Sequence, residues 1–155
     1  VGMVQQKPNM DLFNIGCYGK ITVFNETPDK RYLINLEGIS CFKIVSEIKT
    51  DYRFRVCEIE TFESFNNNTL ENNLKANILN YFKKYNQLKK ISVNLDELSE
   101  LNVVDLLKLI IMVSPFEVSV KQMFLELRSN KELYESVLST LQIELASKEE
   151  TASIN

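Results

Sequence analysis

The sequence predicts an α+β fold, with strands in the first part of the chain and helices in the rest. Between residues 15 and 45, apolar and polar side chains alternate with a period of two, and turn residues bound each run, as is typical of strands. Beyond residue 68 the apolar spacing becomes that of helices. The 155 residues, 45% hydrophobic and 25% charged, fit one folded domain or a domain with a closely packed annex.

Three consecutive antiparallel strands are expected over residues 19–25, 31–37 and 40–45. Pro28 presets the backbone for the turn between the first two strands. Gly38 is expected to break the chain between the second strand and the third.

Side-chain alternation predicts which residues share a face in these strands. Phe24 is out of phase with Ile21 and Val23, so it should lie on the opposite side of its strand. Phe24 then either packs under the helical layer or belongs to an exposed apolar patch. The return strand should present one apolar face, made of Tyr32, Ile34 and Leu36.

Two further strands flank this region. Residues 1–6 form a strand-like segment, and a polar loop over residues 7–14 follows it. After a charged connector over residues 47–51, a long strand is expected over residues 52–61. The apolar residues of that strand change face along its length, which predicts a bulge near Val56.

The helical part is expected to begin after a polar linker, Asn66–Asn68, with Thr69 as the N-cap of its first helix. The apolar residues of that helix form one stripe: Leu70, Leu74, Ile78, Tyr81, Phe82 and Tyr85. Further helices are expected over residues 96–101, 103–113, 120–127 and 130–147.

Two of these helices carry capping boxes, Ser119 with Gln122 and Ser129 with Glu132. The apolar stripes predict that the helices pack as one core, fixed against the strands. Phe116 is placed to contribute to that core, because a proline turns the chain immediately before it.

The sequence also excludes several kinds of chemistry. It contains no histidine, which removes the Ser-His-Asp and Cys-His mechanisms. Residues 16–20, Gly-Cys-Tyr-Gly-Lys, lack the spacing of a phosphate-binding loop. We therefore expect neither ATPase nor peptidase activity, and no cofactor or metal site.

Charge, apolar run length and cysteine content bear on nucleic acid binding, membrane insertion and the redox state of the compartment. The formal net charge of -3 argues against nucleic acid, and the most basic patch, the lysines around Tyr85, is small. No apolar run reaches the roughly 18 residues that span a bilayer. Cys17, Cys41 and Cys57 are an odd number with no close pair in the sequence, which fits buried thiols in a reducing cytoplasm.

Several short motifs occur in a characteristic order along the chain. Those before residue 50 are Gly2-Met3-Val4-Gln5, Ile15-Gly16-Cys17, Gly19-Lys20-Ile21, Pro28-Asp29, Tyr32-Leu33-Ile34, Leu36-Glu37-Gly38 and Phe42-Lys43-Ile44. A downstream block contains Pro115-Phe116, Lys121-Gln122 and Leu125-Glu126. Together they resemble the N-terminal, substrate-binding domain of the Lon protease, in the form found alone in small bacterial Lon-domain proteins.

The resemblance implies a PUA-like β-barrel followed by a helical bundle. It implies a domain over residues 1–147, with the barrel over residues 1–65, the helical part over 66–147 and a flexible tail over 148–155. The chain starts within a strand-like segment, so the barrel is expected to be incomplete at its N-terminus, with an unpaired edge near residues 1–6.

Three positions depart from the family pattern. Lys30 stands where the family usually has glycine, and if the backbone there is left-handed, lysine costs roughly 1 kcal/mol. Cys41 stands where the family usually has arginine, and Val120 where it often has glutamate.

The resemblance also implies a function. It points to a non-catalytic, cytoplasmic substrate-binding domain that recognises exposed or unfolded protein segments, with a protease or chaperone as a further partner and no membrane partner. The candidate peptide-binding residues are Tyr18, Phe24, Tyr32 and Phe42. The alternatives are a PUA-like module that binds RNA or a small ligand, and a structural interaction module. An accessible barrel face rich in aromatic residues favours peptide, and a basic face favours RNA.

Overall fold

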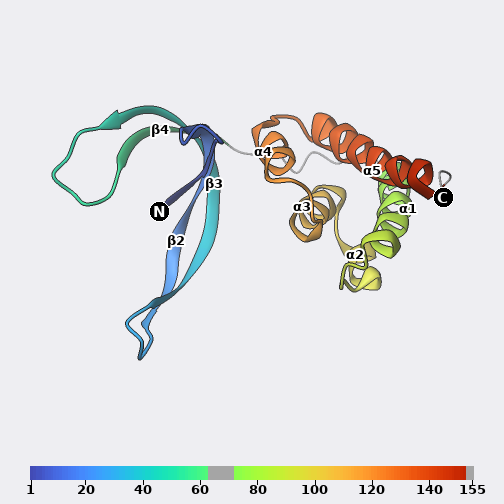
Figure 1. Cartoon of the computed structure of the whole chain (residues 1–155), viewed down its shortest axis with the longest axis horizontal. Helices are drawn as coiled ribbons and strands as arrows, with labels where there is room; N and C mark the ends of the chain where they lie inside the picture. The colour runs from blue at the N-terminus through green and yellow to red at the C-terminus, as the bar shows by residue number, and fades with distance from the viewer. Residues whose placement is uncertain (63–71, 153–155) are drawn as a thin grey trace. The chain divides into compact units, whose positions relative to one another are not determined.

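The computed structural model describes residues 1–62 and 72–152. It divides the chain into two compact units, Val1–Ser64 and Phe65–Asn155. The first is an antiparallel sheet and the second is a group of helices, which confirms the predicted α+β class (Figure 1). The expected linker Asn66–Asn68, the N-cap Thr69 and Leu70 lie outside the described residues.

Four strands form the sheet in the order β1-β2-β3-β4, each antiparallel to its neighbours. They are β1 (Gly2–Gln6), β2 (Leu12–Glu26), β3 (Tyr32–Ile48) and β4 (Val56–Phe62). The two central strands are much longer than the outer two. Over Lys20–Glu37 they pair only with each other and form a two-stranded arm that extends beyond the rest of the sheet (Figure 1).

The predicted break at Gly38 is wrong, because β3 continues through it as a single strand. The register shifts between Tyr18 and Gly19, which leaves Ile39 as an extra residue on β3. A Cβ atom at Gly19 would lie 2.6 Å from the carbonyl oxygen of Glu37, so this close approach requires glycine. Gly19 therefore serves a bulge, and Gly38 lies within one long strand and does not separate two short ones.

The boundaries of β2 and β4 also differ from the prediction. β2 begins at Leu12, within the segment that was expected to be a loop. β4 begins at Val56, because residues 51–54 bend away from an extended conformation. The bulge expected near Val56 lies instead on the partner strand, between Ile44 and Ser46.

Hydrogen bonds among Thr27, Lys30 and Arg31 stabilise the turn at the tip of the arm. The amide of Thr27 donates to the Arg31 carbonyl at 2.8 Å, and the amide of Lys30 donates to the Thr27 carbonyl at 2.9 Å. The Thr27 hydroxyl and the Arg31 guanidinium both donate to Asp29, and they lower the pKa of its carboxyl group. Lys30 adopts a φ of 64°, the left-handed conformation that disfavours a side chain.

Over residues 72–152 the structure describes five helices, and their bounds lie close to those that the apolar spacing predicts. They are α1 (Asn72–Lys89), α2 (Leu95–Glu100), α3 (Val103–Val113), α4 (Val118–Glu126) and α5 (Asn130–Ala152). α3 has the predicted bounds, whereas α5 continues beyond its predicted end at residue 147 into the segment expected to be a tail.

The observed N-caps of the helices agree only in part with the capping boxes predicted from the sequence. The hydroxyl of Ser129 accepts a hydrogen bond from the amide of Glu132, as the capping box predicts. The box at Ser119 is wrong, because α4 begins two residues earlier than predicted, with Glu117 at its N-cap position and no side-chain hydrogen bond there. Two residues that the pattern did not single out cap α2 and α3, namely Asn94 and Asn102.

The helical unit has one apolar core, as the stripes predict. Side chains from α1, α3 and α5 have no exposed surface: Ile78, Phe82, Leu106, Leu107, Ile110, Leu133, Val137 and Leu141. The ring of Phe116 lies between those of Tyr85 and Phe124, with centroid separations of 5.6 and 5.9 Å. Burial, with a smaller effect from the charge of Glu144, raises the pKa of Tyr85 to about 12.

The left-handed conformation of Lys30 predicts that Lys30→Gly raises the free energy of unfolding by up to about 1 kcal/mol, because glycine adopts a positive φ without steric cost. Lys43→Gly is the matched control, since Lys43 is exposed within β3. Glycine there should lower stability by about 0.5–1 kcal/mol. Urea unfolding of both variants measures the difference, and a Lys30→Gly variant less stable than the parent would contradict the prediction.

The aromatic cluster predicts that Phe116→Ala lowers the free energy of unfolding by about 3–5 kcal/mol, because it leaves a cavity next to Tyr85 and Phe124. Val118→Ala is the control, because its side chain is 54% exposed and its loss should cost little. Thermal melting followed by circular dichroism compares the two. The sequence also predicts a single unfolding transition for both units, and two separate transitions in the parent protein would contradict that expectation.

Candidate functional site

The arm gathers apolar side chains on one of its two faces. Cross-strand partners in an antiparallel pair project to the same side, as do residues two apart along one strand. Phe24 pairs with Ile34 and Ile21 pairs with Leu36, while Glu26 pairs with Tyr32. We call the resulting surface the apolar face of the arm, and it consists of Ile21, Phe24, Tyr32, Ile34 and Leu36.

A bulge creates this arrangement. The register shifts between Ile21 and Val23, so that one extra residue of β2 stands against β3. The shift moves Ile21 onto the side that carries Phe24. The prediction that Ile21 and Phe24 lie on opposite sides is therefore wrong, because strict alternation fails at a bulge. The predicted face of Tyr32, Ile34 and Leu36 agrees with the register.

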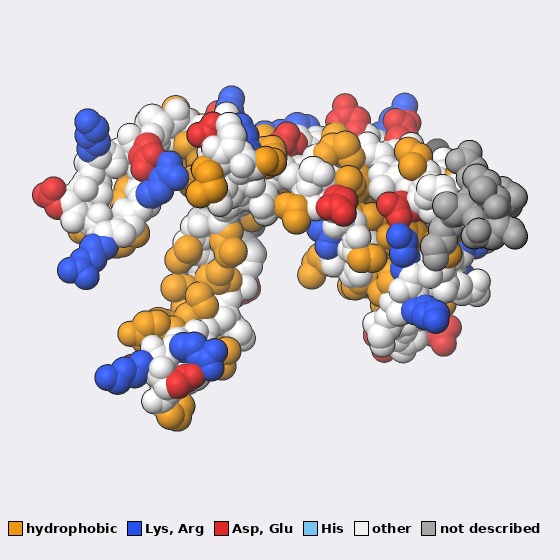
Figure 2. Space-filling model, in the orientation of Figure 1, with side chains coloured by type: hydrophobic (Ala, Val, Ile, Leu, Met, Phe, Trp, Pro, Cys, Tyr) orange, Lys and Arg blue, Asp and Glu red, His pale blue; other side chains and the backbone are white. Residues whose placement is uncertain are grey.

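The apolar face of the arm is open to solvent. Phe24 is 60% exposed and Tyr32 is 61% exposed, and their rings stack with centroids 5.0 Å apart. Ile34 is 43% exposed. Hydrophobic side chains gather along the arm in the space-filling view (Figure 2). Within the sheet unit Phe24 is thus part of an exposed apolar patch, as one of the two alternatives expects.

The opposite face of the arm has a different composition. Four of its six residues are polar or charged, and two are apolar: Lys20, Asn25, Asn35 and Glu37, with Val23 and Leu33. Leu33 is 59% exposed and follows Tyr32 directly along β3. The two faces therefore provide adjacent, exposed apolar residues, Leu33 and Ile34, in different surroundings.

The other two candidate peptide-binding residues, Tyr18 and Phe42, lie next to each other near the root of the arm. The rings of Tyr18 and Phe42 are 6.4 Å apart, and Phe42 is only 3% exposed. Phe42 also lies against the backbone of β1, where a Cβ atom at Gly2 would come within 3.1 Å of its ring. Phe42 is thus part of the small core of the sheet, and only Phe24 and Tyr32 of the four candidates form an accessible pair.

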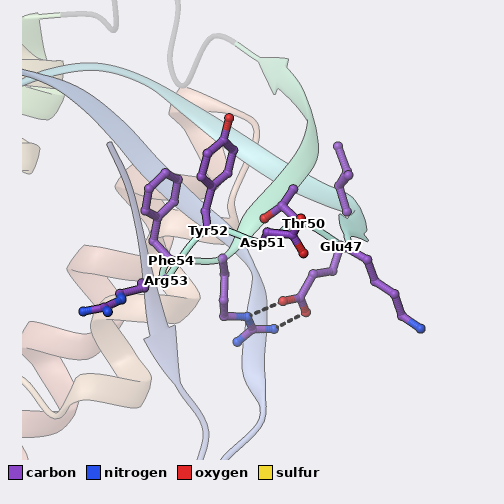
Figure 3. Close-up of a pocket in the computed structure, with 9 residues that line it drawn as sticks. Glu47, Thr50, Asp51, Tyr52, Arg53 and Phe54 are labelled. Atoms are coloured by element: carbon purple, nitrogen blue, oxygen red, sulfur yellow. Dashed lines mark hydrogen bonds and ion pairs between the residues drawn. The ribbon is translucent and has the colours of Figure 1, made fainter.

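A second exposed aromatic pair lies in the loop between β3 and β4, which encloses an open hollow (Figure 3). Tyr52 and Phe54 are each 66% exposed, and their rings stack at 5.0 Å with an angle of 3° between planes. Arg55 donates to both carboxylate oxygens of Glu47, at 2.8 and 2.6 Å, and lowers the pKa of that carboxyl group. The sequence missed this pair, because its alternation resembled a continuing strand.

The basic patch of the helical unit lacks a stacking surface for nucleic acid. Tyr85, the aromatic residue between its lysines, has no exposed surface. The ammonium group of Lys89 lies 2.7 Å from the carboxylate of Glu144, which neutralises part of the patch. Bases bind to such patches by stacking on open aromatic rings, so the geometry does not favour the RNA alternative.

Two features of the described residues concern metal ions and membranes. Among residues 1–62 and 72–152, no three histidine, cysteine or acidic side chains lie close enough together to hold a metal ion. None of the helices in the same part of the chain has the length and apolar character needed to cross a bilayer.

Comparisons with known proteins agree with this architecture. Residues 2–142 match the family described as the ATP-dependent protease La (LON) substrate-binding domain. The fold is similar to the crystal structure of a Lon N-terminal domain protein from Xanthomonas campestris, with a TM-score of 0.67 and 14% identity, over 89% of this chain and 73% of that one. No curated protein matches significantly. The family match covers most of the chain, which therefore belongs to the Lon substrate-binding domain family.

Proposed function

We propose that this domain binds exposed apolar segments of unfolded protein chains through the apolar face of the arm. The observation that carries the proposal is the open, stacked pair of Phe24 and Tyr32, extended by the side chain of Ile34. Contiguous apolar surface with this degree of exposure is typical of sites that bind other proteins. Family membership supports a substrate-binding role, and the Lon substrate-binding domain is a non-catalytic module.

The chemistry of the face fits an unfolded chain as the ligand. Aromatic and branched aliphatic side chains attract apolar side chains without demanding a particular sequence. Within the described residues, each strand of the arm has one neighbouring strand only, so the backbone groups that point outward along both edges have no strand partner. We propose that selectivity for apolar segments comes from the side chains of the apolar face, which suits a domain that must accept many different segments.

The expected affinity is modest. If about 600 Å² of apolar surface is buried in total, the gross gain is about 15 kcal/mol, at about 25 cal/mol per Å². Association and chain ordering cost about 4–15 kcal/mol, so most of that gain is lost. Weak, reversible binding is consistent with the handling of transient unfolded segments, and we propose that it takes place in a reducing, cytoplasmic compartment in which the three cysteines stay as thiols.

The test measures binding of fluorescein-labelled, reduced and carboxymethylated lactalbumin, which stays unfolded, by fluorescence anisotropy. Ile34→Ser should weaken binding by about tenfold, because it removes roughly 1.5 kcal/mol of apolar contact. Leu33→Ser is the matched control, since Leu33 neighbours Ile34 but projects from the opposite face. The control should leave the affinity within about twofold, and melting curves establish that both variants are folded.

Four results would count against the proposal. The parent protein could fail to bind the unfolded probe, or Leu33→Ser could weaken binding as much as Ile34→Ser does. A labelled single-stranded RNA that binds the parent and the Ile34→Ser variant equally well, in the absence of unfolded-protein binding, would favour the RNA alternative. Binding of casein accompanied by its cleavage would contradict a purely non-catalytic domain.

A further inference from the structure

Two of the three cysteines face each other across neighbouring strands. Cys17 on β2 pairs in register with Cys41 on β3, immediately below the root of the arm. Their Sγ atoms are 3.4 Å apart, and both residues are thiols in the structure. Cys41 is 3% exposed, whereas Cys17 is only half-buried. This proximity could not be predicted from spacing, because 23 residues lie between the two positions in the chain.

The strand geometry is compatible with a disulfide at this position. Directly opposed residues of antiparallel strands have Cα atoms about 4.5–5.5 Å apart, and disulfides span about 4.4–6.8 Å between Cα atoms. The sulfur atoms must approach by about 1.4 Å to reach the S–S bond length of about 2.05 Å. Rotation of the two side chains can supply that movement while the strands stay paired.

We propose that Cys17 and Cys41 form a redox-sensitive pair, which closes to a cross-strand disulfide by exchange with a small disulfide such as oxidised glutathione. The more exposed Cys17 loses its proton, attacks one sulfur of oxidised glutathione and releases one molecule of glutathione. Cys41 then loses its proton and attacks the Cys17 sulfur, which releases the second molecule. Two protein thiols are oxidised, and one oxidised glutathione is reduced to two glutathione molecules that take up the two protons.

The third cysteine cannot take part within the same molecule. Cys57 on β4 pairs with Glu47, six residues along β3 from Cys41. At about 3.3 Å per residue, the distance along the strand is about 20 Å. A disulfide formed by the folded chain is therefore specific to Cys17 and Cys41.

The surroundings of Cys17 favour its neutral thiol form over the thiolate. A hydrogen bond with Cys41, burial and the charge on Cys41 all raise the pKa of the Cys17 thiol above its ordinary value. Since the thiolate is the nucleophile, exchange is slow at neutral pH, on a timescale of up to hours.

The cross-link would have a defined structural consequence. It closes a loop that contains both strands of the arm and the turn at its tip. Closing this loop reduces the freedom of the unfolded chain, which stabilises the folded sheet. Oxidation would therefore fix the root from which the apolar face of the arm extends, without a change in the residues that form this face.

The test incubates the reduced, folded full chain with oxidised glutathione in the absence of denaturant. We expect loss of two of the three thiols, a monomer lighter by two hydrogens, and a Cys17–Cys41 peptide after digestion without reduction. The Cys57→Ser variant should form the same cross-link and should melt at a higher temperature after oxidation, with reversal by dithiothreitol. The Cys17→Ser and Cys41→Ser variants should form no intramolecular disulfide.

Several outcomes would overturn the proposal. They are three thiols that persist after oxidation, a stable glutathione adduct on Cys17 with Cys41 still reduced, and oxidation that yields only dimers joined through Cys57. An unchanged or lower melting temperature of the cross-linked Cys57→Ser variant would show that the disulfide does not stabilise the sheet, and it would refute the stabilising role assigned to it.

Discussion

The pairing of β2 with β3 is the interaction on which the whole sheet unit depends. Both outer strands pair only with these two, β1 with β2 and β4 with β3. The same pairing builds the arm, aligns Cys17 with Cys41 and brings Phe24 next to Tyr32. A slip of one residue would move every side chain of a strand to the opposite face. The exposed site and the cysteine pair therefore exist only in this register.

Much of the arm could be predicted from the sequence, because alternation and turn residues are local signals. The turn at Pro28 and the shared face of Tyr32 and Ile34 follow directly from them. The bulge beside Ile21 could not be predicted, since one extra residue depends on how the partner strand is aligned and leaves no local mark. The position of Ile21 on the apolar face was consequently missed, as was the continuation of β3 through Gly38.

The helical unit was easier to predict, because helix periodicity extends over many residues and the residues buried in the core follow the same spacing. α3 begins and ends where its apolar spacing indicates. Caps were less predictable: Ser119 has the right sequence pattern but lies within the first turn of α4. A capping box describes a local preference, and the start of a helix is also set by the packing of its apolar side chains, such as Phe124.

The arm combines a functional surface with limited stability, and the two properties are linked. A two-stranded ribbon is only marginally stable in water. The stack of Phe24 on Tyr32 contributes about 0.5–1.5 kcal/mol beyond its buried area, whereas the left-handed Lys30 offsets about 1 kcal/mol of that gain. A ligand that covers the apolar face stabilises the arm to which it binds, by an amount set by its concentration and affinity.

This coupling determines how substitutions on the arm must be interpreted. Serine at Ile34 removes a contact with the ligand and also weakens the cross-strand pair with Phe24. Serine at Leu33 weakens a cross-strand pair, with Asn25, but leaves the apolar face intact. The Ile34→Ser variant loses both the ligand contact and a cross-strand pair, whereas the Leu33→Ser variant loses only a cross-strand pair. The difference between the two variants, and not the result of either alone, therefore isolates the contribution of the face to binding.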